Sequence, residues 1–296
     1  FFNHLTTRRP DAATPSALKW HARLACACKE IMQRTQRNST GMTVRQESWN
    51  QLDSLLPCSS CIAGKMRKSQ RALPHSYTDL RALTNQLISA DNPSRHFGFA
   101  VSRTAATNTQ MNVRNKEVSL DWAIINKENL PGEFNVFAVF YDMNIGLVHV
   151  EFQQSRGQAD EALLGYIQRY GLPSTIIHDN AREFTDGNFA KICKEKGITQ
   201  RMSAPYTPNQ NPAEKYMDVL VSGARSLLYT AGLNAPQFWK HAVEHRTYLQ
   251  NIMALPGRCS PFELTTGKQP DLTYLKIFGC EVMSFVEKGK RTKFEP

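Results

Sequence analysis

The strongest constraint on the fold is the order of the apolar segments from residue 118 onward. Three strand-like segments come first, and helix-like and strand-like segments then alternate. The helix-like segments carry apolar residues on one face, and two of them end at glycine, Gly171 and Gly197. This order predicts an α/β fold with a mixed five-stranded sheet and flanking helices. The expected strands are 118–125, 135–141, 147–152, 174–178 and 198–203, and the expected helices are 159–170, 187–196, 212–230 and 235–251.

The rest of the chain divides by composition and apolar pattern into smaller parts. We expect a polar tail at 1–18, a small helical module at 19–70 whose first helix covers 19–37, and a linker at 71–117 in which 79–88 could form one helix. The sheet domain then covers 118–255, and 256–296 is a C-terminal extension that begins a small basic module. No apolar run approaches the roughly 18 residues of a membrane-spanning helix, so we expect no membrane segment.

The basic excess of the chain lies entirely in its front part. Residues 1–120 contain 17 Lys and Arg against 7 Asp and Glu, whereas residues 121–296 contain 19 of each kind. Positive charge favours a polyanionic partner such as nucleic acid, because neutralising phosphates releases counterions. A merely soluble basic surface fits the charge equally well.

Three acidic residues fall where the expected layout puts strand ends or a helix start. Asp121 lies in the first strand, Asp179 directly follows the fourth, and Glu214 lies in the first turn of the long helix. Such positions can converge at the edge of an open sheet. Carboxylates are the ligands that Mg²⁺ or Mn²⁺ needs for in-line phosphoryl transfer. Asp142, one strand later, competes with Asp121 for the first position.

A second set of residues has the spacing of a zinc site. His21 and Cys26 are followed, after a gap of 31 residues, by the Cys-x-x-Cys pair Cys58 and Cys61. Zn²⁺ takes four nitrogen or sulfur ligands, and a Cys-x-x-Cys turn can present both thiolates to one ion. Cys28 is an alternative to Cys26. The odd number of cysteines, seven, also argues against a disulfide framework.

Three motifs carry a resemblance to a known family. They are His-Asp-Asn-Ala-Arg-Glu-Phe at 178–184, Gly-Ile at 197–198, and Ser-Ala-Pro-Tyr-Thr-Pro-Asn-Gln-Asn-Pro-Ala-Glu at 203–214. Together with Trp-His-Ala-Arg-Leu-Ala-Cys at 20–26, they resemble the pre-integrase zinc module and integrase core of copia-type LTR-retrotransposon polyproteins. The resemblance implies an RNase H-like fold, Asp121, Asp179 and Glu214 as the catalytic triad, and a structural Zn²⁺ on His21, Cys26, Cys58 and Cys61.

The sequence departs from the family pattern in three places. Asp179 and Glu214 have 34 residues between them, one fewer than is usual, and the shortening falls at 211–213. Ala181 and Arg182 replace paired glycines. Cys26 stands where the family has a second His, a change that keeps a good zinc ligand.

Several polar and basic residues are candidates for contacts with DNA. Four basic residues directly follow the Cys-x-x-Cys pair, and other candidates lie close in sequence to Asp179 and Glu214. Lys215 could contact a DNA phosphate or could equally be a solvated lysine on the helix surface. The candidates are Lys65, Arg67, Lys68, Arg71, Asn180, Tyr206, Asn209, Gln210 and Lys215.

The resemblance implies an integrase that joins DNA 3′ ends to target DNA with Mg²⁺ or Mn²⁺. Its partner would be double-stranded DNA, its working form a homo-oligomer, and its site of action the nucleus, reached through a cytoplasmic particle. The alternative is an inactive or host-retained copy that acts as a zinc-dependent nucleic-acid-binding protein.

Overall fold

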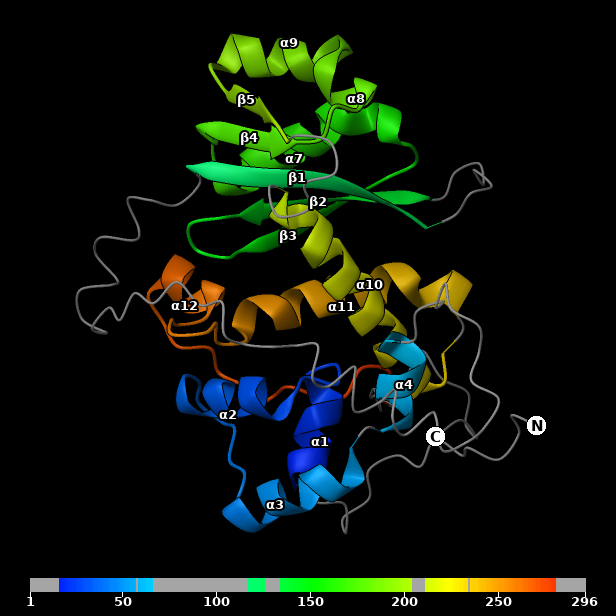
Figure 1. The fold of residues 1–296 in the computed structure, drawn as a ribbon, viewed down its shortest axis with the longest axis vertical. Coiled ribbons are helices and arrows are strands. Elements are labelled where there is room, and N and C mark those ends of the chain that lie inside the picture. Colours follow the sequence, from blue (N-terminus) through cyan, green and yellow to red (C-terminus); the bar gives the residue numbers. More distant parts are fainter. Residues whose placement is uncertain are drawn as a thin grey trace, which may run out of the picture.

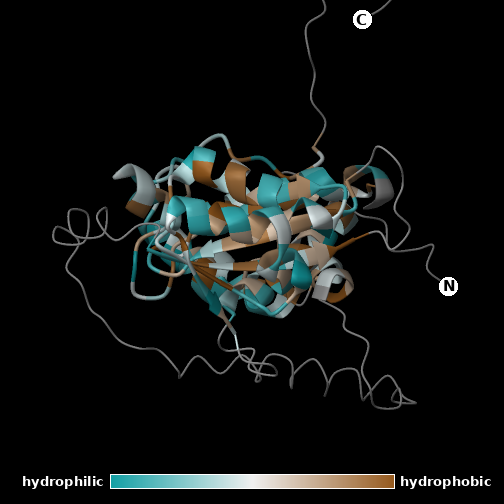
Figure 2. Ribbon diagram, turned by 90° about the horizontal axis from the view of Figure 1, so that it is seen from above, coloured by the Kyte–Doolittle hydropathy of each residue, from teal (hydrophilic) through white to brown (hydrophobic). Residues whose placement is uncertain are grey.

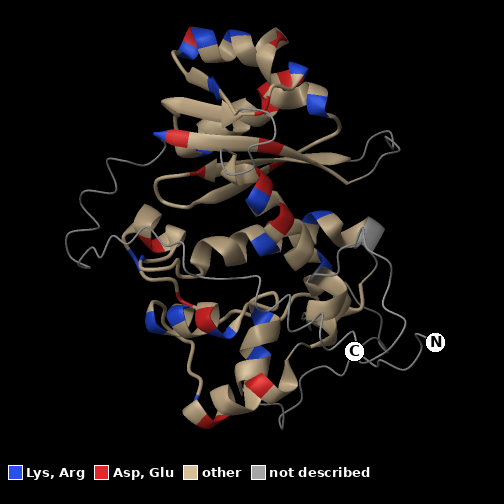
Figure 3. Ribbon diagram, viewed as in Figure 1, with Lys and Arg blue, Asp and Glu red and all other residues tan. Residues whose placement is uncertain are grey.

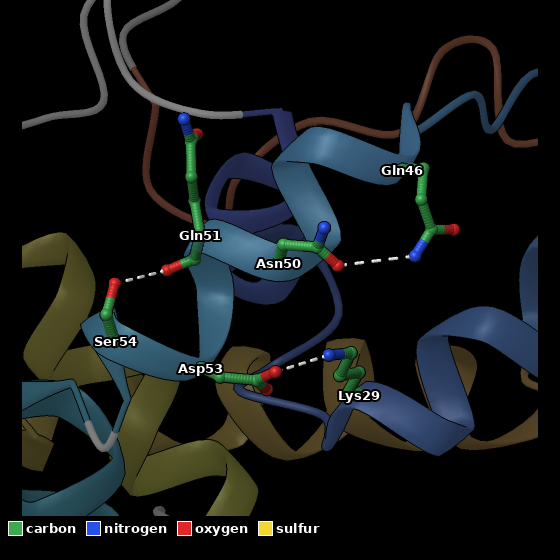
Figure 4. Close-up of polar contacts among 6 residues, drawn as sticks. All are labelled: Lys29, Gln46, Asn50, Gln51, Asp53 and Ser54. Atoms are coloured by element: carbon green, nitrogen blue, oxygen red, sulfur yellow. Dashed lines mark hydrogen bonds and ion pairs between the residues drawn. The ribbon is translucent and has the colours of Figure 1, made fainter.

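The part of the chain before the sheet is a cluster of short helices. The computed structural model describes residues 16–56, 58–65, 116–125, 134–203, 211–233 and 235–280, so the linker and its expected helix at 79–88 lie outside the described residues. The helices are α1 (Ser16–Arg23), α2 (Lys29–Arg37), α3 (Gln46–Leu55) and α4 (Ser59–Lys65). The Lys29 ammonium and the Asp53 carboxylate, 2.5 Å apart, tie α2 to α3 (Figure 4).

The single helix expected at 19–37 is wrong, because the chain turns between α1 and α2. Ala25 and Cys26 adopt left-handed backbone conformations, with φ of 52° and 59°. A helix cannot continue through such residues. The turn is closed by the backbone N–H of Cys26, which donates to the carbonyl oxygen of His21 at 2.8 Å. It therefore brings Cys26 back beside the end of α1.

The sheet confirms the mixed five-stranded arrangement. Its order is β3-β2-β1-β4-β5, with the first three strands antiparallel and β4 and β5 parallel to β1 (Figure 1). The hairpin between β2 and β3 turns at 143–147. The strands are β1 (Glu117–Ile124), β2 (Val136–Asp142), β3 (Val148–Gln153), β4 (Thr175–His178) and β5 (Thr199–Met202).

Helices cover both faces of the sheet. The expected helices at 159–170 and 187–196 are present with those limits, as α7 and α9, and the two long helices agree to within a residue. The 3₁₀ turn η1 and the short helices α8 and α12 were not expected. The elements are η1 (Arg156–Gln158), α7 (Ala159–Tyr170), α8 (Arg182–Thr185), α9 (Gly187–Lys196), α10 (Pro212–Ala231), α11 (Ala235–Ile252) and α12 (Pro261–Thr266).

Alternate residues of β1 face different helix layers, as the two-residue period of a strand requires. Leu120 packs in the core with α7 and α9, whereas Ala123 packs in the core with α10 and α11. Figure 2 shows hydrophobic residues gathered on the strands, between helices that carry both kinds of residue. Because Asp121 shares the parity of Ala123, it lies on the side of the sheet that α10 covers. None of the described helices is both long and apolar enough to cross a membrane.

The N-terminal helices lie on the side of α10 and α11 opposite the sheet (Figure 1) and pack against both helices. One apolar cluster contains Trp20, Met32 and Trp49 from the N-terminal helices together with Leu227 and Ile252 from α10 and α11. The segment after α12 joins the same cluster and pairs with residue 40 through an isolated parallel bridge. The N-terminal helices and the sheet domain therefore share one core.

Helix α4 approaches α10 too closely for a side chain at Gly64. A Cβ added there would lie 1.8 Å from Ser226 Oγ and 2.8 Å from the Ser226 backbone nitrogen. We therefore expect Gly64→Ala to lower the free energy of unfolding by about 1–3 kcal/mol, the usual cost of overpacking. Urea unfolding measures this loss. Gly157→Ala is the matched control, because its nearest neighbour would be Ser155 Oγ at an ordinary 3.5 Å. Equal stability of both variants would contradict the prediction.

Candidate active site and metal centre

Four side chains of the N-terminal helices converge on one point. The ligand atoms of His21, Cys26, Cys58 and Cys61 all lie within 4.8 Å of one another. His21 Nε2 lies 3.1 Å from Cys61 Sγ and 3.4 Å from Cys58 Sγ. The left-handed turn after α1 supplies Cys26, the residue directly before α4 is Cys58, and the first turn of α4 supplies Cys61.

Hydrogen bonding orients the histidine of this cluster. His21 is buried, and its Nδ1–H donates to the carbonyl oxygen of Ala27 at 2.9 Å. In the neutral imidazole, that bond makes Nε2 the nitrogen that can bind a metal, and Nε2 faces the thiols of Cys58 and Cys61, as in the usual arrangement of metal-bound histidines. Contact with Cys26, and then with Cys61 and His21, lowers the pKa of the Cys58 thiol, although burial opposes the shift.

The four residues fit a tetrahedral zinc ion. With zinc–sulfur bonds of about 2.3 Å, neighbouring sulfur ligands of a tetrahedron lie about 3.7–3.8 Å apart. Here Cys26 and Cys58 Sγ are 3.8 Å apart, and Cys58 and Cys61 Sγ are 3.5 Å apart. The alternative ligand Cys28 is exposed at the start of α2 and does not belong to the cluster. The residues that gather are therefore the four that the spacing predicts.

The three predicted carboxylates lie on elements that contact one another. Asp121 lies in the middle of β1, Asp179 directly after β4, and Glu214 in the first turn of α10, which packs beside β1. Figure 3 shows acidic residues on β1 and at the start of α10 where these elements meet. Burial, opposed by the N–H of Trp122 and reinforced by the charges of Asp179 and Glu214, raises the pKa of Asp121 to about 6.

Each carboxylate is held by its own local structure. Asp121 Oδ1 accepts from the N–H of Trp122 at 2.7 Å, and Asp179 Oδ1 accepts from the N–H of Ala181 at 3.2 Å. His178 fixes the turn at Asp179, because its Nδ1 donates to the Asp179 carbonyl oxygen at 2.6 Å. The charges of Asp179 and Glu214 act on the half-buried Asp121 carboxylate, and a divalent cation bound among these groups would relieve that repulsion.

Asp142, the competitor of Asp121, has a structural role. It is buried at the end of β2, and its Oδ1 accepts from the N–H groups of Asn144 at 2.9 Å and Ile145 at 3.3 Å. These bonds close the turn between β2 and β3. Its pairing partner on β1 is Val118, three residues before Asp121. After burial, the charges of Asp179 and Glu214 raise the pKa of Asp121, which favours Asp121 over Asp142 as the first carboxylate of the predicted trio.

Two residues join the carboxylate-bearing elements: Ser119, which the sequence did not single out, and Asn211, which the sequence indicated only as a helix cap. Ser119 and Asn211 are buried, and the Ser119 hydroxyl donates to Asn211 Oδ1. Asn211 precedes α10 as expected, but its side chain makes no hydrogen bond to the helix N-terminus and reaches β1 instead. The signal available in the sequence was the spacing of two residues between Ser119 and Asp121, which places both on one face of a strand.

Of the remaining residues predicted to contact DNA, the structure describes some and not others. Glu214 and Lys215 line an open pocket of about 520 Å³ together with Tyr141 and Tyr216, whose rings stack with centroids 4.1 Å apart. Asn180 is exposed beside Asp179, and Lys65 ends α4. Arg67, Lys68, Arg71, Tyr206, Asn209 and Gln210 lie outside the described residues.

Comparison with known proteins identifies the relatives of this chain. No family model matches it. It is 34% identical over 122 residues to the retrovirus-related Pol polyprotein from transposon TNT 1-94 of Nicotiana tabacum, a match that covers 40% of this chain and 9% of the polyprotein. The chain is a relative of retrotransposon Pol polyproteins. This relationship confirms the resemblance that the motifs carry, and the chain spans less than a tenth of that polyprotein's length.

Two solved structures are also similar to this chain. The HTLV-2 integrase catalytic core domain in complex with magnesium is 17% identical, with 51% of this chain and 96% of that chain covered and a TM-score of 0.40. The catalytic core domain of BIV integrase is 21% identical, with 52% and 95% covered and a TM-score of 0.41. The sheet order and strand directions described above are those of the expected RNase H-like core.

Proposed function

We propose that this chain is a retrotransposon integrase that joins the 3′ ends of element DNA to target DNA in a metal-dependent reaction. One observation carries the proposal: Asp121, Asp179 and Glu214 are far apart in the sequence but lie on elements that contact one another, and the charges of Asp179 and Glu214 add to the burial that raises the pKa of Asp121. A cluster of carboxylates is the ligand set that phosphoryl transfer with hard divalent cations requires. The relationship to a transposon Pol polyprotein supports it.

The three carboxylates would hold Mg²⁺ or Mn²⁺. When bound, a pair of such cations activates the attacking oxygen and stabilises the leaving oxygen of the phosphodiester. The residues of this chain place their carboxylate oxygens from two strands and one helix, which keeps their separation fixed. Lys215 lies next to Glu214 on the exposed side of α10, where its ammonium group can contact a DNA phosphate.

We propose a structural role for zinc at His21, Cys26, Cys58 and Cys61. The donor set, the separation of its sulfur atoms and the hydrogen bond on His21 Nδ1 support this assignment. Double-stranded DNA is the proposed partner, consistent with the basic excess of residues 1–120. Action as a homo-oligomer in the nucleus follows from the integrase assignment alone.

A strand-transfer assay tests the function. Purified protein is mixed with a labelled duplex that has a recessed 3′ end, a plasmid target, and Mg²⁺ or Mn²⁺. We expect a joined product that disappears in Asp179→Asn and Glu214→Gln, because each substitution removes an anionic ligand from the trio. If folded protein binds zinc and DNA but makes no product with either metal, the chain is an inactive binding copy and the integrase proposal fails.

A further inference from the structure

A buried polar link joins the start of α10 to β1. The side chain of Asn211, directly before the helix, makes no hydrogen bond to the helix N-terminus. Its Nδ2 donates instead to the carbonyl oxygen of Leu120 at 3.3 Å, and its Oδ1 accepts from the Ser119 hydroxyl. The side chain that would normally cap the helix is therefore bound to the strand.

A residue of β1 caps the N-terminus of α10 instead. The first N–H groups of a helix have no partner within the helix, and a side-chain oxygen usually accepts from one of them. Here the Ser119 oxygen accepts from the backbone N–H of Ala213 at 3.0 Å. Pro212, at the first helical position, has no N–H to satisfy. Ser119 and Asn211 are 0% and 5% exposed, so water does not compete for these bonds.

The link connects the residues that neighbour two of the three carboxylates. Ser119 lies two residues before Asp121, on the same face of β1. Ala213, which Ser119 caps, immediately precedes Glu214. Leu120, which binds Asn211, immediately precedes Asp121. These hydrogen bonds therefore join the backbone beside Asp121 to the backbone beside Glu214 without touching either carboxylate.

We propose that Ser119 and Asn211 are positioning residues that hold Glu214 opposite Asp121 and so set the affinity of the site for divalent cations. The inference rests on the proposed function for its metal. It also explains how the chain absorbs the one-residue shortening between Asp179 and Glu214. The shortening falls at the entry to α10, and there Asn211 and Pro212 fix the first helical turn against β1.

Metal binding by the full-length, zinc-loaded protein tests this role. We compare Ser119→Ala and Asn211→Ala with Ser119→Thr, which keeps the hydroxyl, and measure bound Mn²⁺ by the loss of the free-ion electron paramagnetic resonance signal. Ser260→Ala is the matched control. Ser260 is equally buried and caps α12 by accepting from the Glu263 N–H at 3.1 Å. Thermal unfolding of each variant reports the purely structural cost.

We expect Ser119→Ala and Asn211→Ala to weaken Mn²⁺ binding about 10–100-fold, the usual effect of removing a group that orients a metal ligand. Ser119→Thr should stay within a few fold of the wild type, and Ser260→Ala should lower the melting temperature without changing Mn²⁺ affinity. If Ser119→Ala lowers the melting temperature and leaves Mn²⁺ affinity unchanged, Ser119 is only structural and the inference is wrong.

Hydrogen exchange separates this inference from the proposed function. In metal-free protein, the Ala213 amide should be protected in the wild type and exchange faster in Ser119→Ala, because its acceptor is gone. Unchanged exchange would overturn the link itself. If Asp179→Asn binds Mn²⁺ as tightly as the wild type, the proposed metal site is wrong, whatever the hydrogen exchange shows.

Discussion

Replacing Cys61 by Ser is expected to abolish zinc binding and to unfold the N-terminal helices. The four ligands come from the end of α1, the turn after it, and α4, and the short helices themselves are only seven to ten residues long. Isolated helices of this length are marginal in water. Zinc binding contributes roughly 10 kcal/mol or more to small domains of this kind, so its loss removes most of what orders them.

The effect should extend beyond the N-terminal helices. Leu227, Leu249 and Ile252 of α10 and α11 lie in the apolar cluster that those helices cover, and unfolding would expose them. The Ser60 and Thr230 hydroxyls, which are 2.8 Å apart, would also separate. We expect a melting temperature lower by about 10 °C or more, since 1 kcal/mol corresponds to about 2–4 °C in a domain of this size.

Zinc content and calorimetry check the prediction. The matched control is Cys28→Ser, because Cys28 is an exposed cysteine at the start of α2 that lies outside the cluster. It should keep one equivalent of zinc and nearly the wild-type melting temperature. A Cys61→Ser protein that retains both would show that the cluster is not a structural zinc site. A chelator that strips zinc from the wild type should reproduce the Cys61→Ser result.

The sequence predicted the sheet well because its signals are local. Short apolar segments mark most of the strands, and Gly171 and Gly197 end α7 and α9 with positive φ of 89° and 70°, a conformation that glycine adopts without strain. Pro212 marked the first turn of α10 correctly. These signals depend on a few adjacent residues, so they can be read without knowledge of the fold.

The missed features depend on contacts between distant residues. Ala25 and Cys26 are ordinary residues for a helix, and their left-handed conformation is imposed by the packing of α1, α2 and α4 around the cysteine cluster. The pairing of Thr40 with the segment after α12 joins residues more than 200 positions apart. No periodicity in the sequence indicates such a pairing.

At the candidate site, too, some features could be predicted from the sequence and others could not. The types and spacing of the metal ligands were readable, because few residue types bind zinc or magnesium and their order along the chain is distinctive. The choice between Asp121 and Asp142 was not readable, since both are aspartates on neighbouring strands. The contact of the Asn211 side chain with β1 could not be predicted either, because Asn at this position ordinarily caps its own helix.

Replacing Asp121 should remove strand-transfer activity, whereas replacing Asp142 should lower the stability of the fold. Asp121→Asn keeps the size of the side chain and its bond to the Trp122 N–H, but removes the charge that faces Asp179 and Glu214. The folded protein should therefore lose strand transfer by about a thousandfold or more, because cation binding to the phosphoryl-transfer site is worth several kcal/mol. Its stability should stay the same or rise, since burial and neighbouring charges disfavour an ionised Asp121.

Asp142→Ala should instead destabilise the protein and leave joining chemistry intact in the fraction that is folded. Its carboxylate accepts two N–H bonds in the turn between β2 and β3, and removing it leaves the buried N–H of Ile145 without a partner, at a cost of about 1–3 kcal/mol. Urea unfolding and strand transfer at matched folded fractions measure the two effects. If Asp142→Ala abolishes joining at full stability while Asp121→Asn remains active, the catalytic trio must be reassigned to Asp142. If neither substitution affects joining, the carboxylates do not form the active site.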